Sequence, residues 1–324
     1  MSGKFSRLYH PSWFQGSVSG RRYFEGWYFK QVSRDRQHVL SVIPGISLGK
    51  YRHAFVQVLN GITGASEYFE YDISDFQSAR TGFDIRIGPN RFSENSVTLD
   101  INQKRKHISG TLRFSGLNPF PVRLFSPGIM GWYAFVPFME CYHGVVSMTH
   151  RVDGVVEAGD TRMDFSAGKG YMEKDWGTSF PESWVWTQCN HFEDEEASFM
   201  LSVARIPWLF RAFPGFISFL RYKGSLITFA TYTGAKVLRL EESGGILRIE
   251  IRDRRHRLSV EVRPAVSAVL KAPRSGSMER HIKESVDSEI SVRLAGSGGV
   301  VLFEGKGTRA GLERVGEVEK LPGF

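Results

Sequence analysis

Cysteine is almost absent from this chain of 324 residues, in which only Cys141 and Cys189 occur. Two cysteines cannot build a disulfide framework or a cysteine-based zinc site. Long apolar runs are missing too: no window of about 18 residues is uninterruptedly apolar, so no membrane-spanning helix is expected. The first seven residues lead into no apolar segment of the kind that signal peptides carry, which favours a cytoplasmic location.

Proline is scarce, at 13 residues, whereas the 34 glycines fit many tight turns and the aromatic share of 13% exceeds what a core alone requires. The net charge of +8 allows attraction to an anionic membrane face. The densest basic run, Arg252–Arg257, is interpreted as a solvated hairpin turn. Because no RRM, KH or zinc-finger spacing accompanies it, nucleic acid is not an expected partner.

Short runs of alternating apolar and polar residues, separated by glycine, asparagine or aspartate about every ten residues, predict an antiparallel β-sandwich or barrel. The fold class is therefore all-β. The predicted strands are Val39–Ile43, Ala54–Leu59, Phe69–Ile73, Phe83–Ile87, Ser96–Ile101, Gly110–Phe114, Gly144–Met148, Ser198–Ala204, Leu226–Tyr232, Leu247–Ile251, Leu258–Val262, Ser288–Leu294 and Val300–Phe303.

An internal repeat indicates two similar domains. The pattern Glu-x-Trp-x-aromatic-x-Gln occurs at Glu25–Gln31 and again at Glu182–Gln188. Similar strands follow both copies, and a third echo relates Gly154–Gly159 to Gly299–Gly305. Ordered echoes of this kind indicate duplicated units. We therefore predict two β domains, residues 1–167 and 168–324, with Gly168–Phe192 opening the second.

The segment Gly168–Phe192 carries the chemistry. Its first half is interpreted as a glycine-bracketed turn in which Glu173 and Asp175, two residues apart, project to the side of Tyr171 if the chain is extended. Trp176 follows directly. The second half predicts a strand whose one face carries Trp184, Trp186, Gln188, Asn190 and Phe192. An aromatic wall with amides, beside acids, suits a large apolar ligand with a polar head. The alternative is a turn salt-bridged by Lys169 and Lys174.

Other motifs are set aside. Gly45–Gly49 matches G-x-S-x-G, but the following His53–Leu59 alternates as a strand, whereas a nucleophile elbow needs a helix there. Gly305–Gly311 lacks phosphate-loop spacing. The nine histidines show no metal-binding spacing, and His143 and His150 are expected to have core or surface roles. No metal and no cofactor are expected.

Two aromatic stretches do not fit the strand pattern. They are Asn118–Phe138 and Pro207–Tyr222, and the second is broken by Pro214-Gly215. Each is interpreted either as a connection over a barrel end or as a lid or membrane-contacting loop. Peripheral membrane contact through Trp208–Tyr222 is therefore an expected interaction, and no protein partner is predicted.

The segments Gly170–Gly177 and Phe180–Phe192 resemble the signature of the tocopherol cyclase family. Tyr23–Lys30 resembles that family's N-terminal signature, and Leu270–Arg274 is similar to a third stretch. This chain is shorter than the plant members and carries Gly177-Thr178-Ser179 where they resemble a glycine run. The family is distantly similar to carotenoid hydratase-type proteins. The resemblance implies tandem lipocalin-like antiparallel β-barrel or sandwich domains, with an apolar pocket inside a barrel or between domains.

The same resemblance implies acid-catalysed closure of a prenylated hydroquinone to a chromanol, or hydration of a related isoprenoid double bond. It points to Glu173 as the proton donor, with Asp175 as second candidate. The rival hypotheses are a non-catalytic carrier of isoprenoid lipids and a membrane-associated scaffold. Expected ligand contacts are Tyr171, Trp176, Trp184, Trp186, Gln188, Asn190, Glu25, Trp27, Phe29 and Gln31.

Overall fold

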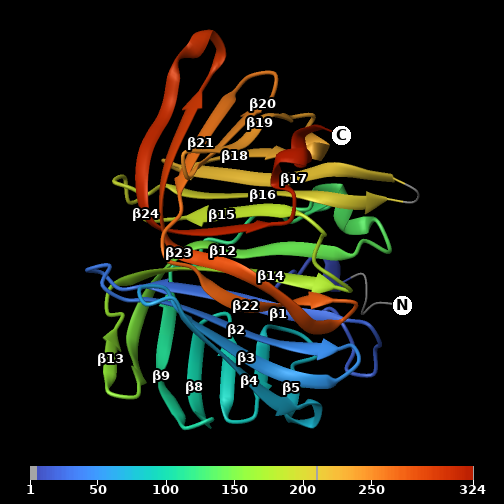
Figure 1. Cartoon of the computed structure of the whole chain (residues 1–324), viewed down its shortest axis with the longest axis vertical. Coiled ribbons are helices and arrows are strands. Elements are labelled where there is room, and N and C mark those ends of the chain that lie inside the picture. Colours follow the sequence, from blue (N-terminus) through green and yellow to red (C-terminus); the bar gives the residue numbers. More distant parts are fainter. Residues whose placement is uncertain (1–5, 209–210, 324) are drawn as a thin grey trace. The chain divides into compact units, whose positions relative to one another are not determined.

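The computed structural model describes residues 6–208 and 211–323 and is almost entirely β-structure, which confirms the all-β class (Figure 1). The chain forms two compact units. The first comprises residues 1–180 with 270–281, and the second comprises 181–269 with 282–324. Within the described residues, no helix has the length and apolar character needed to cross a membrane.

The first unit is built on one antiparallel sheet with the strand order β4-β3-β2-β1-β14-β12-β9-β8-β7-β6-β5, and β13 pairs with β12. Its strands are β1 (Phe24–Val32), β2 (Val39–Leu48), β3 (Arg52–Asn60), β4 (Ala65–Asp72), β5 (Phe76–Ser78), β6 (Asp84–Ile87), β7 (Asn90–Ser93), β8 (Ser96–Gln103), β9 (Lys106–Ser115), β12 (Cys141–Ala158), β13 (Thr161–Asp164) and β14 (Gly168–Gly177).

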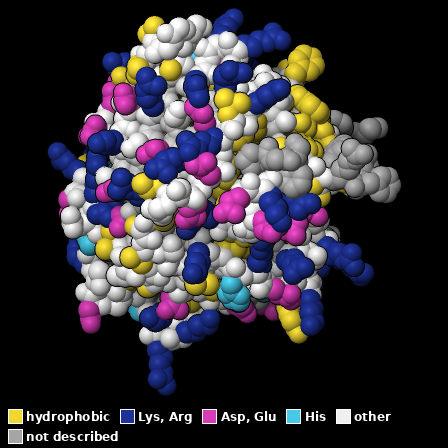
Figure 2. Space-filling model, turned by 45° about the horizontal axis from the view of Figure 1, so that its top comes forward, with side chains coloured by type: hydrophobic (Ala, Val, Ile, Leu, Met, Phe, Trp, Pro, Cys, Tyr) yellow, Lys and Arg dark blue, Asp and Glu magenta, His cyan; other side chains and the backbone are white. Residues whose placement is uncertain are grey.

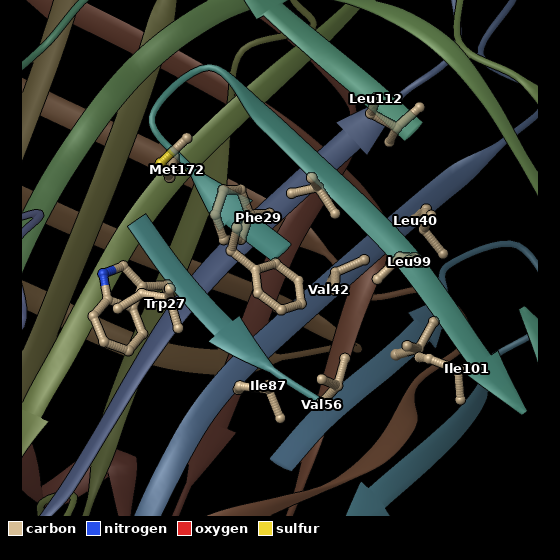
Figure 3. Close-up of a cluster of buried hydrophobic side chains, with 14 of the residues drawn as sticks. Trp27, Phe29, Leu40, Val42, Val56, Ile87, Leu99, Ile101, Leu112 and Met172 are labelled. Atoms are coloured by element: carbon tan, nitrogen blue, oxygen red, sulfur yellow. The ribbon is translucent and has the colours of Figure 1, made fainter. Parts of the chain in front are cut away.

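This sheet curls around a single core. Side chains from strands at both of its ends belong to one buried cluster, in which Val56 of β3 and Ile87 of β6 lie with Met172 of β14 (Figure 3). Aromatic rings fill the centre, because Phe29 packs against three others. The centroid of the Phe29 ring lies 5.9 Å from that of Phe83, 6.1 Å from Phe92 and 6.0 Å from Phe114. The arrangement is lipocalin-like, with an interior occupied by the protein's own side chains.

The second unit repeats the plan, with the order β18-β17-β16-β15-β24-β23-β21-β20-β19. Its strands are β15 (Trp184–Cys189), β16 (Ser198–Trp208), β17 (Arg211–Tyr222), β18 (Ser225–Ala230), β19 (Lys236–Ser243), β20 (Ile246–Arg252), β21 (Arg257–Arg263), β23 (Ser277–Ala295) and β24 (Val301–Val315). Its own core includes Val185, Leu201, Phe229 and Val292. The hairpin formed by β22 (Ala268–Arg274) and the start of β23 contributes residues 270–281 to the first unit.

The two sheets reproduce the predicted repeat in part. β1 to β4 form a meander in sequence order, and so do β15 to β18, with Trp27 in β1 and Trp184 in β15. The third echo is wrong. Gly154 lies within β12, two strands away from β1, whereas Val301–Glu304 lies in β24, which is the direct neighbour of β15. The matching sequences therefore occupy different places in the two sheets.

The predicted boundary at residue 167 is also wrong. Residues 168–177 form strand β14, which pairs with β1 on one side and β12 on the other, so this segment completes the first sheet. Its glycines serve close packing. A Cβ on Gly170 would lie 2.1 Å from Oε1 of Gln31 and 2.3 Å from Nε2 of His150, distances that no side chain tolerates. The division between the units falls after Phe180.

The stretch Pro207–Tyr222, which lacks a strand pattern in the sequence, is β-structure: β16 pairs with β17 from Ser198 opposite Arg221 to Trp208 opposite Arg211. Pro214 is tolerated because β18 pairs with β17 only from Ile217 onward, which leaves the preceding part of β17 as an edge without a ladder partner on that side. Leu209 and Phe210 lie outside the described residues.

Residues 118–140 form a long connection before β12, with the short strands β10 (Val122–Arg123) and β11 (Ser126–Pro127) and a 3-10 turn at Gly131–Phe135. Buried Phe120, Ile129 and Met130 anchor it. Leu124, Phe125 and Phe138 point outward and are 67%, 80% and 96% exposed. The stretch is therefore a connection that contains two short strands, and its role as a lid or membrane-contacting loop stays a prediction.

A buried ion pair ties β1 to β14 on the core side of the sheet. Nζ of Lys174 lies 2.5 Å from Oε1 of Glu25, and both side chains are fully buried. The backbone N–H groups of Gln15 and Gly16 and the hydroxyl of Tyr23 donate to the same carboxylate. Burial lowers the pKa of Lys174 to about 8, against the opposing effect of Glu25. The pair therefore depends on both partners.

Replacing Glu25 with Gln should destabilise the protein by about 3–5 kcal/mol, because it leaves a buried ammonium group without a counter-charge. The double variant E25Q/K174M should recover part of that loss. Equilibrium denaturation in urea measures both. The exposed pair Arg91–Asp84 gives the control, since R91Q should cost less than about 1 kcal/mol. An E25Q variant as stable as R91Q would contradict this assignment.

Candidate functional site

The two faces of β14 have different roles. Met172 lies in the core of the first unit, and Lys174 makes the buried ion pair on that same side. Tyr171, Glu173 and Asp175 alternate with them, so they share the opposite face, as their two-residue spacing predicts. The cross-strand register adds His143 opposite Asp175 and Tyr28 opposite Glu173. The expected turn is thus an extended strand that presents both acids together.

His143 of β12 lies between the two carboxylates. Its Nδ1 is 2.8 Å from Oδ1 of Asp175, within hydrogen-bond distance. Its Nε2 is 3.3 Å from Oε2 of Glu173, close enough for an ion pair although the alignment is not that of a hydrogen bond. The Tyr171 hydroxyl donates to the same Oε2 at 2.5 Å. We call His143, Glu173 and Asp175 the acid–histidine triad.

Burial and charge act in opposite directions on this triad. Burial disfavours the charged imidazole of His143, but the carboxylates of Asp175 and Glu173 outweigh it and raise the pKa of His143 to about 10. Burial, and then the Glu173 carboxylate, raise the pKa of Tyr171 well above its ordinary value, so its hydroxyl stays a donor. Burial and the neighbouring Asp175 likewise raise the pKa of the Cys141 thiol. His143 is therefore an imidazolium at neutral pH.

The triad can store and move a proton. Asp175 accepts from Nδ1 and fixes the ring, which directs Nε2 and its proton toward Glu173. The side chain of Glu173 is only 6% exposed, so little water reaches its carboxyl group. A buried carboxyl group that is held by a tyrosine hydroxyl beside an imidazole is suited to general acid catalysis when it carries the proton.

The same three groups could also hold a metal ion, since their ligand atoms all lie within 4.8 Å of one another. No metal site was expected from the sequence, because the ligands come from two strands and show no local spacing. His143 already bridges both carboxylates as a cation. A divalent ion would have to displace the imidazolium proton and reorient the ring.

Trp176 does not lie beside the acids. It belongs to the face of β14 that carries Lys174, whose Nζ lies 4.8 Å from the Trp176 ring centroid and 4.9 Å from that of Trp27. Its ring stacks on Tyr142 with centroids 5.7 Å apart. Strand alternation separates Trp176 from Asp175, which a turn would not have done. Its expected ligand contact stays a prediction.

The predicted contacts from the N-terminal motif point into the first unit. Glu25 is engaged by Lys174, and Trp27 and Phe29 are fully buried core residues. Gln31 is buried as well, and neither atom of its amide has a hydrogen-bond partner among the residues that the structure describes. Its amide oxygen and Nε2 of His150 both lie close to Gly170. Burial lowers the pKa of His150 to about 3. None of these four side chains shares the face of the acid–histidine triad.

Trp184, Trp186, Gln188 and Asn190 belong to the second unit. Val185 and Cys189 contribute to that unit's core, so the predicted alternation along β15 is confirmed as far as Cys189. Nε1 of Trp184 donates to Oε2 of Glu313 at 2.6 Å. Gly311 leaves room for the Trp186 ring, which a Cβ there would meet at 2.5 Å. Phe192 departs from the pattern: the strand ends at Cys189, and Phe192 joins the core.

Residues 121–316, more than half of the chain, match the family described as tocopherol cyclase-like. The chain belongs to the tocopherol cyclase-like family. The matched range contains both strands of the acid–histidine triad, β12 and β14. The sequence match thus shows the family, and the structure shows the all-β fold with two large antiparallel sheets, while the reaction and the substrate are matters for proposal.

Two curated relatives are chloroplastic tocopherol cyclases, one from Zea mays and one described as probable from Oryza sativa subsp. japonica. Each is 34% identical to this tocopherol cyclase-like chain over 74 residues, which are 23% of this chain. The match spans only 16% of the length of either relative.

Solved structures share the fold at low sequence identity. A protein assigned as AttH from Nitrosomonas europaea has a TM-score of 0.55 and 13% identity, with 92% of this chain and 94% of that chain covered. CghA with Sch210972 also has a TM-score of 0.55, with 12% identity and 90% and 88% of the two chains covered. At such identities the likeness concerns the fold alone.

Sequence reasoning missed His143 in this tocopherol cyclase-like chain. It stands 30 residues before Glu173, and only the pairing of β12 with β14 brings the two together. A register shift between Val145 and Ser147 follows directly, so even the correct strand pair would not have given its position. The available signal was weak: a polar residue at the start of a strand that becomes largely apolar.

The raised pKa of His143 makes stability depend on pH. Its folded-state pKa of about 10 exceeds the ordinary 6.5, so the triad's stabilisation is fully present below pH 6.5 and is lost as the pH rises toward 10. The difference in free energy of unfolding between the native protein and His143→Gln should therefore shrink over this range. Urea denaturation at several pH values measures it. A difference that is constant or grows would show that the imidazole is neutral.

Proposed function

We propose that this protein catalyses proton addition to an isoprenoid double bond, with cyclisation of a prenylated hydroquinone to a chromanol as the leading reaction. One observation carries the proposal: the triad in which the His143 imidazolium lies between a buried Glu173 and a partly exposed Asp175. Membership of the tocopherol cyclase-like family supports the class of chemistry.

The proposed step balances without a co-reactant. Glu173, in its protonated form, donates a proton to the side-chain alkene nearest the ring, and a tertiary cation forms. The phenol oxygen attacks that cation, its own proton returns to Glu173, and the product is an isomer of the substrate. Asp175 keeps the imidazole oriented, and the Tyr171 hydroxyl positions the Glu173 oxygen. If water attacks in place of the phenol, the same residues perform hydration.

The burial of the triad supports this chemistry in two ways. A water-poor setting favours the neutral form of a carboxyl group, which is the form that a general acid must have before it donates its proton. It also protects a tertiary cation from unwanted capture. The competing function is an isoprenoid carrier without catalysis, which would need the apolar surroundings but not the triad.

Replacing Glu173 with Gln separates enzyme from carrier. It should lower turnover of a prenylated hydroquinone by about 10²–10⁴-fold, while the affinity for that ligand changes little, because the amide keeps the shape but cannot supply a proton. Product formation followed by chromatography, and ligand binding by tryptophan fluorescence, give the two readouts. The matched control is Glu157→Gln, an exposed carboxylate on β12.

Full turnover by the Glu173→Gln variant would contradict the proposed acid. Dialysis against a chelator should leave the native rate unchanged. A rate that falls on dialysis and returns with a divalent cation would instead assign the triad to metal binding.

We also propose peripheral contact with lipid, which a prenylated substrate favours. The segment Trp208–Tyr222 is the contact expected from the sequence. The connection 118–140 is a second candidate, because its exposed Leu124, Phe125 and Phe138 suit a membrane interface. No acidic residue occurs between Asp100 and Glu140, and Arg123 is exposed. On the face shown in Figure 2, hydrophobic side chains gather toward one side among many basic ones.

Flotation with anionic vesicles tests this contact. The variant F125S/F138S should reduce the vesicle-bound fraction several-fold, because two large apolar side chains no longer enter the interface. Replacing Trp208 and Trp132 in separate variants compares how much each of the two segments contributes to the vesicle-bound fraction. The control is V266S, an exposed apolar residue in a different unit. If F125S/F138S floats as well as the native protein, the connection 118–140 is not the contacting element.

A further inference from the structure

Five basic side chains from three separate parts of the chain line one cavity of the first unit. The cavity has a volume of about 620 Å³. It is lined by Arg21 and Arg22 before β1, by Lys50 and Arg52 at the β2–β3 turn, and by Arg274 at the tip of the β22–β23 hairpin. We call it the basic cavity.

Backbone contacts hold these parts together. The N–H of Arg22 donates to the Leu48 carbonyl at 2.9 Å, which fixes the approach to β1 against the end of β2. The hairpin tip is held to the same place, because the Ser47 hydroxyl donates to the Gly276 carbonyl at 2.8 Å. The N–H of Lys50 donates to the Ser277 hydroxyl oxygen at 2.9 Å. The lining is therefore built by the fold and not by chance proximity of long side chains.

The close packing of the β22–β23 hairpin tip against the residues before β1 requires glycine at position 276. Its φ of +78° belongs to the left-handed region, and a Cβ there would lie 2.5 Å from the backbone nitrogen of Tyr23. A side chain would therefore push the hairpin tip, and Arg274 with it, away from Arg21 and Arg22.

The positive charge of the basic cavity is not compensated. Across the described residues, no ion pair joins any of its five basic side chains to a carboxylate, and Glu279 is the one acidic side chain that lines it. The Arg52 guanidinium donates instead to the carbonyls of Gly20 and Val18. Like charges gathered in a concave site repel one another and create a potential that attracts an anion.

The donor chemistry indicates the class of anion. Guanidinium groups bind phosphate oxygens with paired N–H donors, and several of them together favour a ligand with two or more negative charges. The Ser277 hydroxyl accepts from Lys50 and keeps its own hydrogen for a ligand oxygen. A volume of this size accommodates a diphosphate or a phosphorylated headgroup.

We propose that the basic cavity is a binding site for a phosphate-bearing anion. It shares no residue with the acid–histidine triad, so it does not rest on the proposed reaction. A diphosphate ester free in solution and the headgroup of an anionic phospholipid present the same phosphate chemistry, and the experiment distinguishes them.

The test compares the native protein with R21Q/R274Q. Neither of these side chains makes a hydrogen bond or an ion pair within the described residues that the fold depends on, so the variant should remain folded. Calorimetric titration with inorganic diphosphate at low salt should show binding that the variant weakens by about tenfold or more. The control R254Q/R255Q removes the same charge from the β20–β21 turn of the second unit and should leave that affinity unchanged.

A second arm uses phosphatidylcholine vesicles with and without phosphatidic acid. Binding to the acidic vesicles that R21Q/R274Q loses and R254Q/R255Q retains, without a response to inorganic diphosphate, assigns the site to a lipid headgroup. Loss in both arms assigns it to phosphate in general. The proposal is overturned if R21Q/R274Q binds diphosphate and vesicles as the native protein does, or if R254Q/R255Q weakens both to the same extent.

Discussion

Strand β14 is hydrogen-bonded on both sides, and this constraint organises the first unit. A strand that is fixed between β1 and β12 cannot rotate, so its alternate side chains are committed to opposite faces. One face carries Lys174, which is paired with Glu25 against the core. The other face carries Glu173 and Asp175, which share His143. Five ionisable groups therefore meet on β14 and its two neighbouring strands, in two separate clusters, and Asp175 is the most exposed of them at 24%.

The two clusters differ in charge balance. The pair of Glu25 and Lys174 is neutral and is completed by backbone donors, as expected of a structural element. The acid–histidine triad has two carboxylates for one imidazolium, so it holds an excess of negative charge in a water-poor place. Such an excess is costly to bury, and one further proton on a carboxylate removes it. A cluster of this kind is typical of functional sites, where pKa values are displaced for a purpose.

The features of the fold and of the candidate site that depend on local residue spacing could be predicted from the sequence. Tyr171, Glu173 and Asp175 share a face because a two-residue period holds in any extended segment. The all-β class followed from alternating runs, most of which fall within observed strands. The boundary was misplaced because Gly168, Gly170 and Gly177 were interpreted as turn residues, whereas Gly170 leaves space for Gln31 and His150. The strand β17 within Pro207–Tyr222 could not be predicted, because a largely apolar run shows no alternation of apolar and polar residues.

The remaining features depend on pairing between strands that are distant in the sequence, which local patterns do not predict. His143 reaches Glu173 only through the register of β12 against β14. Similarly, Arg21, Lys50 and Arg274 share a cavity only because a hairpin that lies late in the chain belongs to the first unit. In both cases each residue is unremarkable in its own segment. The chemistry arises from segments that are distant in sequence and adjacent in the fold.

The protonation state of His143 tests the central claim most directly. Nitrogen-15 NMR of the imidazole side chain in the native protein at neutral pH distinguishes the two forms, since both nitrogens of an imidazolium are protonated and a neutral ring has one nitrogen without a proton. The account predicts an imidazolium that persists well above pH 7, since the pKa is raised to about 10. A neutral ring at pH 7 would contradict the charged triad and remove the proposed proton store.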